Sequence, residues 1–144
     1  MKNALALALA LLASAFVLSG CNTSVGVDNA ETREGQFSNV TGILVTRYNA
    51  DPEAVFNSVK RTLDSMHGTL RTGETDERGA NKELISVTVF ARTVGDLEIK
   101  IDVAKAEDEI TKAAYTKVTV KYGFFGNLPE SQQIVSKISS NLRR

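Results

Sequence analysis

Few side chains in this sequence are of a type that carries chemistry. Cys21 is the only cysteine and His67 the only histidine among 144 residues. A lone cysteine cannot form an internal disulfide, and a single histidine offers little material for a metal site or for a base that titrates near neutral pH. The other candidates are a small acidic cluster and a glycine-aromatic stretch: Glu74, Asp76 and Glu77, and Gly123-Phe124-Phe125-Gly126.

Cys21 lies at the end of an apolar run and directly before the polar Asn22. The chain opens with Lys2 and is largely apolar from Ala4 to Leu18. A positive start followed by a short apolar core is typical of a secretory signal. The run is too short for a comfortable transmembrane helix, which needs about 20 apolar residues. The sequence therefore predicts export.

The residues before the cysteine indicate the type of signal. Leu18-Ser19-Gly20-Cys21 resembles the bacterial lipobox, which implies cleavage between Gly20 and Cys21, a diacylglycerol on the thiol and an acylated new amino terminus. A thiolate is the natural nucleophile for forming that thioether. We therefore expect residues 1–20 to be a lipoprotein signal peptide and Cys21 to be an attachment point. Two alternatives are an ordinary signal cleaved near Ala13-Ser14-Ala15 and a retained anchor helix.

Lipidation of Cys21 would place the protein in the cell envelope. Several buried acyl chains, at ~0.8 kcal/mol per buried CH₂, would make the membrane attachment effectively permanent. Asn22 is not the aspartate that resembles an inner-membrane retention signal in enteric bacteria. The expected location is therefore the outer membrane, facing the periplasm.

The charge balance argues against nucleic acid as a partner. Lys and Arg together number 17, as do Asp and Glu, so the formal net charge is zero. No basic excess is available to neutralise a phosphate backbone. The hydrophobic fraction of 42% and charged fraction of 24% are those of a folded globular protein, and the length fits one domain.

Two segments are expected after the leader. Residues 21–41 begin with the cysteine and are rich in Asn, Thr, Ser, Gly and charge, with no sustained helix or strand period, which predicts a flexible tether. A coil of about 20 residues spans roughly 25 Å on average, enough to lift a domain clear of lipid headgroups. Residues 42–144 have regular periods and are expected to form a single α+β domain.

The periods in this domain predict two helices and several strands. Asp51 and Pro52 mark the start of a helix that ends at Gly68, and Pro129 lies near the start of a second. Strands with one apolar and one charged face need one apolar cover. We therefore expect a two-layer α+β fold, an antiparallel sheet of four to five strands with two helices on one face, in the order β-α-β-β-β-β-α. The strands are expected within residues 43–49, 69–77, 83–92, 96–104 and 117–124.

With these elements in place, the chain resembles a family of uncharacterised bacterial lipoproteins built on a domain of unknown function. The resemblance covers roughly Gly42 to Leu142. It rests on the lipobox, the helix after Asp51-Pro52, the alternating strands and the turn Tyr122-Gly123-Phe124-Phe125-Gly126 before the last helix. The segment from Glu107 to Glu109 departs from the shorter hairpin expected of the family. The resemblance implies fold and location, and no activity comes with it.

Each candidate site has a structural alternative. Gly123, Phe124, Phe125 and Gly126 form a candidate interaction turn, but such rings are more often buried under a helix while the glycines adopt conformations closed to other residues. His67 lies where a helix dipole favours an imidazolium, so capping is expected ahead of catalysis. The acidic cluster is expected in a solvated turn, because a calcium loop needs more oxygen ligands at alternate positions.

The preferred hypothesis is a membrane-anchored, non-enzymatic envelope domain without cofactor or metal. It would bind an envelope protein or another envelope component through its open sheet face or the glycine-aromatic turn. One alternative is a binder of a small apolar ligand or lipid between sheet and helices, which requires a cavity of about 300 Å³ or more there. The other is a hydrolase, which requires His67 or a carboxylate pair in a concave site.

Overall fold

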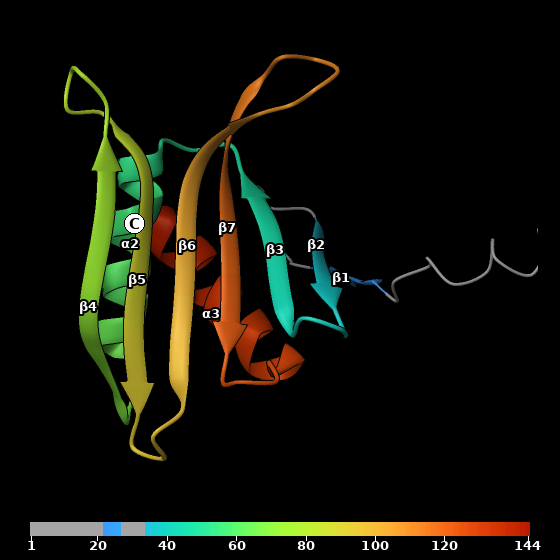
Figure 1. The fold of residues 1–144 in the computed structure, drawn as a ribbon, viewed down its shortest axis with the longest axis vertical. Coiled ribbons are helices and arrows are strands. Elements are labelled where there is room, and N and C mark those ends of the chain that lie inside the picture. Colours follow the sequence, from blue (N-terminus) through green and yellow to red (C-terminus); the bar gives the residue numbers. More distant parts are fainter. Residues whose placement is uncertain (1–21, 27–33) are drawn as a thin grey trace, which may run out of the picture.

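The structure, a computed structural model, describes residues 22–26 and 34–144 (Figure 1). Within these residues, seven strands form one antiparallel sheet in the spatial order β1-β2-β3-β7-β6-β5-β4. Two helices lie on one face of the sheet, and we call the other the open face. The elements in chain order are β1 (Asn22–Gly26), β2 (Glu34–Ser38), β3 (Ile43–Tyr48), α2 (Pro52–Ser65), β4 (Thr69–Arg78), β5 (Leu84–Thr93), β6 (Glu98–Glu107), β7 (Ala114–Tyr122) and α3 (Leu128–Leu142).

The predicted α+β class, with two helices against an antiparallel sheet, is confirmed, but the predicted number of strands is wrong. The sheet has seven strands rather than four to five. The chain order differs at its start, because β1 and β2 precede the strand at which the predicted order began. Both additional strands lie in the segment that the sequence analysis assigned to the tether.

The composition of β1 and β2 explains why the sequence pattern did not predict them. Their sequences, NTSVG and EGQFS, are dominated by residues that are poor strand formers or polar, so no hydrophobic alternation appears. β2 joins the sheet through backbone pairing with β3, in which Phe37 lies opposite Leu44, and β1 pairs with β2. Phe37, on β2, belongs to the hydrophobic core. Strands that are held mainly by backbone hydrogen bonds show no side-chain pattern from which a single sequence could predict them.

Both helices begin at side-chain caps. Asp51 accepts a hydrogen bond from the backbone N–H of Glu53 at 3.0 Å, and Asn127 accepts one from that of Glu130 at 3.1 Å. Each cap satisfies a backbone donor that the first helical turn leaves free. The helices also contact each other, since the Ser58 hydroxyl donates to the Ile138 carbonyl at 2.6 Å. They therefore cover the sheet as one layer.

The core fills the space between this helical layer and the sheet. Alternate residues of the four central strands are buried there, as the period of two requires. The Tyr48 hydroxyl, buried in the same layer, contacts the Val135 carbonyl at 3.1 Å and the Ser139 hydroxyl at 2.9 Å. The main buried apolar side chains are Leu44, Val55, Val59, Leu63, Val87, Val89, Ile99, Ile101, Val103, Val118, Val120, Ile134, Val135 and Ile138.

The two ends of the sheet carry different loops. The lower end in Figure 1 holds the β2–β3 turn (39–42), the β5–β6 loop (94–97) and the β7–α3 turn (123–127), and we call it the aromatic end. The upper end holds the β4–β5 loop (79–83) and the β6–β7 loop (108–113), and we call it the charged end. β1 begins at the aromatic end, because Asn22 pairs with Ser38, the last residue before the β2–β3 turn.

Candidate functional site at the aromatic end of the sheet

The glycine-aromatic turn presents both of its phenyl rings to solvent. Phe124 is 82% exposed and Phe125 is 86% exposed. Their rings meet edge to face, with centroids 5.0 Å apart. The expectation that these rings are buried under the last helix is therefore wrong. Tyr122 and Leu128, on either side of the turn, pack against the core instead, and the turn between them projects outward.

The glycines of the turn have the conformation that the sequence analysis expected of them. Gly123 has φ 71° and Gly126 has φ 78°, in the left-handed region that side chains disfavour. The Gly123 N–H donates to the Glu98 carbonyl at 2.7 Å, which ties the turn to the start of β6. A Cβ atom on Gly126 would overlap the backbone of Gly42, so the β7–α3 and β2–β3 turns pack backbone against backbone. The two rings thus project from a firmly held backbone.

Other exposed apolar side chains lie in the loops of the same end. Val40 is 81% exposed in the β2–β3 turn, and Val94 and Leu97 are exposed in the β5–β6 loop. In a soluble domain, exposed apolar residues are usually scattered, and a group of them indicates an interaction site. Together with Phe124 and Phe125, these three residues form what we call the apolar rim.

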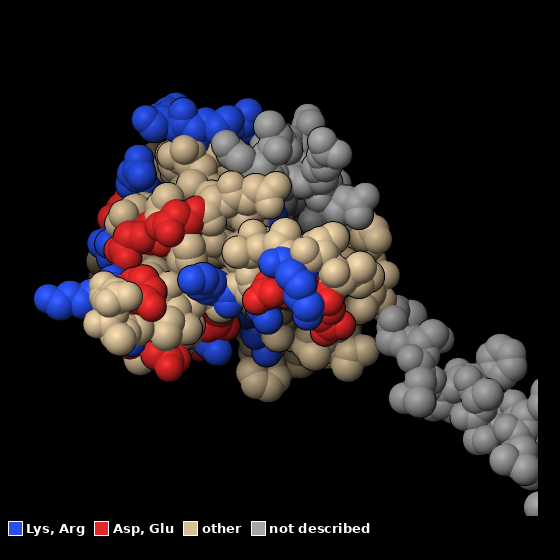
Figure 2. All heavy atoms as spheres, turned by 90° about the horizontal axis from the view of Figure 1, so that it is seen from above, with Lys and Arg blue, Asp and Glu red and all other residues tan. Residues whose placement is uncertain are grey.

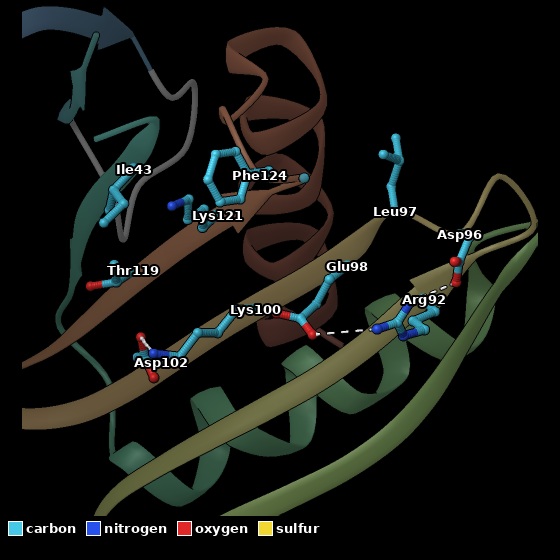
Figure 3. Close-up of a pocket in the computed structure, with 11 residues that line it drawn as sticks. Ile43, Arg92, Asp96, Leu97, Glu98, Lys100, Asp102, Thr119, Lys121 and Phe124 are labelled. Carbon is cyan, nitrogen blue, oxygen red and sulfur yellow. Dashed lines mark hydrogen bonds and ion pairs between the residues drawn. The ribbon is translucent and has the colours of Figure 1, made fainter. Parts of the chain in front are cut away.

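A groove of about 540 Å³ opens on the open face beside this turn (Figure 3). Phe124 and Leu97 line it at the aromatic end, and Ile43 lines it from β3. Thr119 and Gly123 also line it, and the other lining residues are charged: Arg92, Asp96, Glu98, Lys100, Asp102 and Lys121. The groove thus has one apolar end and a polar floor, which suits an amphipathic partner better than a purely apolar one.

Most charges in the groove are compensated by a neighbour. Arg92 forms ion pairs with Asp96 and, at 3.9 Å, with Glu98. The Lys100 ammonium lies 3.4 Å from Asp102, whose other carboxylate oxygen accepts a hydrogen bond from Thr88. Such exposed pairs contribute little to stability, so their main effect is to keep the groove close to neutral.

Lys121 is the exception in this lining. It lies directly opposite Lys100 in the β6–β7 pair, an arrangement of like charges that is unfavourable in a sheet. Its ammonium lies 5.7 Å from the centre of the Phe124 ring, and within the described part of the chain it forms no ion pair. Lys121 therefore offers a positive charge next to an exposed aromatic ring. Only the pairing register brings it there, so the sequence analysis did not single it out.

His67 lies away from the groove lining. It is exposed in the turn between α2 and β4, one residue past Met66, the C-cap of α2. Among the residues that the structure describes, no carboxylate lies within ion-pair distance of the His67 imidazole. A hydrolase that uses His67 as its base would need a carboxylate beside the imidazole to orient it, and the described part of the chain does not place one there.

The acidic cluster lies on β4, which confirms the strand expected within residues 69–77 and contradicts the expectation of a turn there. β4 runs through Thr69–Arg78, and each acidic side chain has its own partner. Glu74 pairs with Arg71 at 3.6 Å, Asp76 with Arg78 at 2.7 Å, and Glu77 accepts from Ser86 at 3.4 Å. Across residues 22–26 and 34–144, no group of three or more His, Cys, Asp or Glu side chains is arranged to hold a metal ion.

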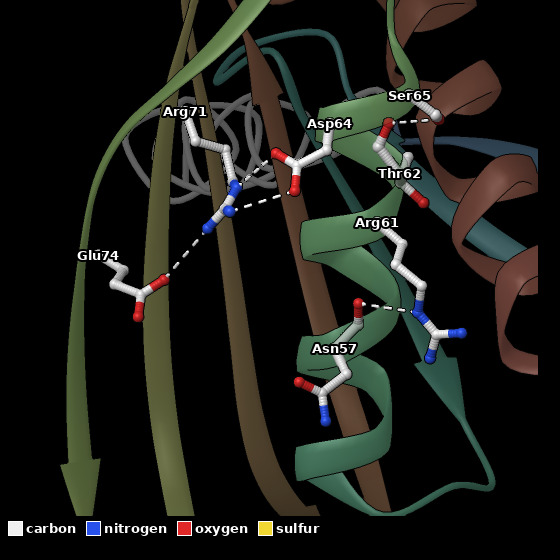
Figure 4. A network of polar contacts seen from close by, with 7 residues as sticks. All are labelled: Asn57, Arg61, Thr62, Asp64, Ser65, Arg71 and Glu74. Carbon is white, nitrogen blue, oxygen red and sulfur yellow. Dashed lines mark hydrogen bonds and ion pairs between the residues drawn. The ribbon is translucent and has the colours of Figure 1, made fainter.

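Arg71 links this strand to the helical layer (Figure 4). Its guanidinium donates two hydrogen bonds to the Asp64 carboxylate of α2, at 2.7 and 3.1 Å. Hydrogen bonding to Asp64, and the charges of Asp64 and Glu74, raise the pKa of Arg71 above its usual value. The network joins the edge strand β4 to α2, so we interpret its role as structural.

The space between the sheet and the helices is occupied by the core. The residues that face each other there are fully or almost fully buried and form one continuous cluster. The groove of about 540 Å³ lies on the opposite face of the sheet from this cluster. This arrangement does not favour an apolar ligand between sheet and helices.

The residues of the predicted lipidation site lie outside the described residues. These are the signal peptide (1–20), the cleavage site between Gly20 and Cys21, and the thiol of Cys21. Within the described residues, each helix is too short or too polar to span a bilayer.

A comparison with protein families finds a match that covers almost the whole chain. The matching family model extends over residues 3–141, from the apolar N-terminal run through Cys21 to the last turn of α3. No curated protein matches the chain. The chain belongs to the family described as Protein of unknown function (DUF3568).

Proposed function

We propose that this protein is a lipid-anchored, non-enzymatic domain of the bacterial cell envelope. Its anchor is a lipid on the Cys21 thiol, added when the signal peptide is cleaved after Gly20. Its contact surface is the aromatic end, made of the glycine-aromatic turn and the groove beside it. Its location is the outer membrane, facing the periplasm.

The leader supports the anchor. Lys2, the apolar run and the sequence Leu18-Ser19-Gly20-Cys21 combine charge, length and motif in the order of a lipoprotein signal. The lipid would also explain why an exported chain has a single cysteine, since a free thiol in an oxidising compartment is open to oxidation. The family match extends over residues 3–141 and so includes most of the apolar N-terminal run and Cys21 along with the domain.

The exposure of Phe124 and Phe125 carries the proposal of a contact surface. A phenyl ring exposed to water forgoes roughly 1.5–3 kcal/mol of burial energy. Two adjacent rings, both more than 80% exposed on a turn that packs tightly against the β2–β3 turn, are best explained by a partner that covers them. Lys121 lines the groove next to the Phe124 ring, and its ammonium could bind a polar or anionic group of the same partner.

The groove also supports a protein partner at the open face. Its floor alternates charges of both signs on β5 and β6, a surface that favours complementary polar contacts over burial of a small apolar molecule. The absence of excess positive charge argues against a nucleic acid. The only histidine, His67, does not line the groove, which is consistent with binding rather than catalysis.

Site-specific photo-crosslinking in intact cells tests this function. A photoreactive amino acid is placed at Phe125 in one full-length variant and at Ile110 in a matched one, because Ile110 is 92% exposed at the charged end. We expect crosslinks to an envelope component from position 125 and few from position 110. Equal crosslinking from both positions would contradict a dedicated surface at the aromatic end.

Cys21→Ser tests the anchor separately. This variant should be released from the membrane fraction while the unaltered protein stays in it. Retention of the Cys21→Ser variant in the membrane would contradict anchoring through the thiol.

A further inference from the structure

We infer that the aromatic end docks onto the bilayer that holds the anchor, with Phe124, Phe125 and Val40 in the interfacial region of the lipid. This inference rests on the lipid anchor proposed for Cys21. It names the partner of the glycine-aromatic turn as the lipid surface itself, and it leaves the groove floor and the open face to other envelope components.

The position of β1 is the first argument. Asn22, the residue directly after Cys21, is already part of the sheet and pairs with Ser38. Thr23 accepts a hydrogen bond from the Asn39 side chain at 3.1 Å, which links β1 to the β2–β3 turn. Consecutive Cα atoms are about 3.8 Å apart, and Asn22 directly follows Cys21 in the sequence, so an anchor at Cys21 would be attached one residue away from this end of the sheet. A lipid on Cys21 would therefore hold the aromatic end, and not the charged end, at the membrane.

This position leaves no room for the long tether that the sequence analysis expected. A coil of about 20 residues would have held the domain roughly 25 Å from its anchor. With β1 beginning at Asn22, the domain starts where the lipid is attached. The loops at the aromatic end are then the surfaces of the domain nearest to the bilayer.

The distribution of exposed apolar side chains is the second argument. Of the eight large apolar side chains that are exposed in the described residues, five lie in loops at the aromatic end and form the apolar rim: Val40, Val94, Leu97, Phe124 and Phe125. Of the other three, Leu70 and Ile85 lie on strands, and Ile110 lies in a loop at the charged end. The glycine-aromatic turn follows β7, three strands from β1 in the sheet, or about 14 Å at a spacing of ~4.8 Å per strand. The rim thus extends along the aromatic end of the sheet, the same end at which β1 follows the proposed anchor.

The charged end has one large exposed apolar side chain in its loops, Ile110, beside charged side chains. Seen from above, it carries Lys, Arg, Asp and Glu side chains of both signs (Figure 2). The β6–β7 loop is held by Asp108, which accepts hydrogen bonds from the backbone N–H groups of Ile110 and Thr111. Asp108 also pairs with Arg47 at 3.2 Å. Charged groups of this density are costly to bring into lipid, so the charged end is suited to face water.

Lys121 gives the docking surface a polar boundary. It lies on the open face just before the turn, beside the Phe124 ring. A lysine next to interfacial aromatic side chains can place its apolar stem at the membrane and its ammonium at the phosphate level. Within the described chain no carboxylate pairs with Lys121, so its ammonium is available to a lipid phosphate.

Tryptophan scanning of the lipidated protein tests this inference, because the natural chain contains no tryptophan. Phe125→Trp places a single reporter in the turn, and Ile110→Trp places one at the charged end with similar exposure. Both mature, lipidated proteins are reconstituted into phosphatidylethanolamine and phosphatidylglycerol vesicles, with and without brominated acyl chains. We expect the Phe125→Trp emission to shift to the blue and to lose most of its intensity with brominated lipid, and the Ile110→Trp emission to do neither.

Mass spectrometry of the reconstituted proteins separates the two proposals. If Cys21 carries no lipid, the anchor fails and this inference fails with it. If Cys21 is lipidated but Phe125→Trp stays as exposed and unquenched as Ile110→Trp, the anchor stands and the docking is overturned. A blue shift of Phe125→Trp in native membranes but not in pure lipid vesicles would likewise overturn docking on lipid and assign the turn to a protein.

Discussion

Gly42 and Gly126 pack backbone against backbone, so closely that a Cβ atom on either residue would overlap the main chain around the other. Both have positive φ, 70° and 78°. This contact joins the β2–β3 turn to the β7–α3 turn. It thereby holds Val40 and the two phenyl rings as parts of one surface.

The first prediction concerns this glycine contact. Gly126→Ala should lower the free energy of unfolding by about 2 kcal/mol or more, because it adds both a steric overlap and a side chain at positive φ. Urea denaturation of the protein and its variant measures the change. Gly73→Ala is the matched control, since a Cβ atom there has no neighbour within 4 Å. It should change stability by less than about 1 kcal/mol, and equal effects of the two substitutions would contradict the contact.

The second prediction tests whether the aromatic rings are exposed. The double substitution Phe124→Ser and Phe125→Ser should leave the free energy of unfolding from urea denaturation nearly unchanged, within about 0.5 kcal/mol, as for most surface substitutions. Phe56→Ala, at a ring that is only 3% exposed in α2, should cost about 3–5 kcal/mol. A comparable loss in the double variant would show that the rings are buried, as the sequence analysis expected.

The third prediction concerns the buried hydroxyl that links β3 to α3. Tyr48→Phe removes the contacts with the Val135 carbonyl and the Ser139 hydroxyl while keeping the ring. It should lower the free energy of unfolding by about 1 kcal/mol. Tyr115→Phe, on the open face, keeps the ring that lies 4.5 Å from the Arg47 guanidinium carbon and should change stability by less than about 0.5 kcal/mol. The reverse ranking in urea denaturation would contradict the packing of α3 on β3.

The fourth prediction concerns pH. Backbone hydrogen bonds from Thr111 and Ile110, with the Arg47 guanidinium, hold the pKa of Asp108 below its usual value of 3.8. A depressed pKa in the folded state contributes stability above the unfolded pKa, and this contribution is lost as pH falls through the folded value. Asp108→Asn should therefore have a lower urea midpoint than the natural protein at pH 7. The difference should disappear once pH falls below the folded pKa. A difference that persists at such low pH would show that the Asp108 charge is not its source.

The order of elements from β3 to α3 could be predicted because local signals and tertiary structure agree there. Leu97, Ile99, Ile101 and Val103 alternate with charged residues, and three of the four are buried in the core. Asp51 was recognisable as a helix cap because its spacing to Pro52 and Glu53 is a local property, and the structure confirms it. Periodicity and capping are decided within a few residues, so one sequence is enough to detect them.

The additional strands and the orientation of the rings depend on partners far away in the sequence. β2 joins the sheet because β3 offers a free edge, and the residues of β2 other than Phe37 carry little apolar signal. The rings project outward because Tyr122 and Leu128 take the core positions on either side of the turn. The groove forms only when β5, β6 and β7 lie side by side, and the same pairing places Lys121 opposite Lys100. None of these relationships is encoded within a single segment.

Intact mass spectrometry of the protein from native membranes tests the lipid anchor most directly. We expect a chain that begins at Cys21, with the mass of a diacylglycerol on the thiol and an acyl group on the new amino terminus. A chain with an unmodified Cys21 thiol would contradict the anchor and, with it, the proposed place of this domain at the membrane.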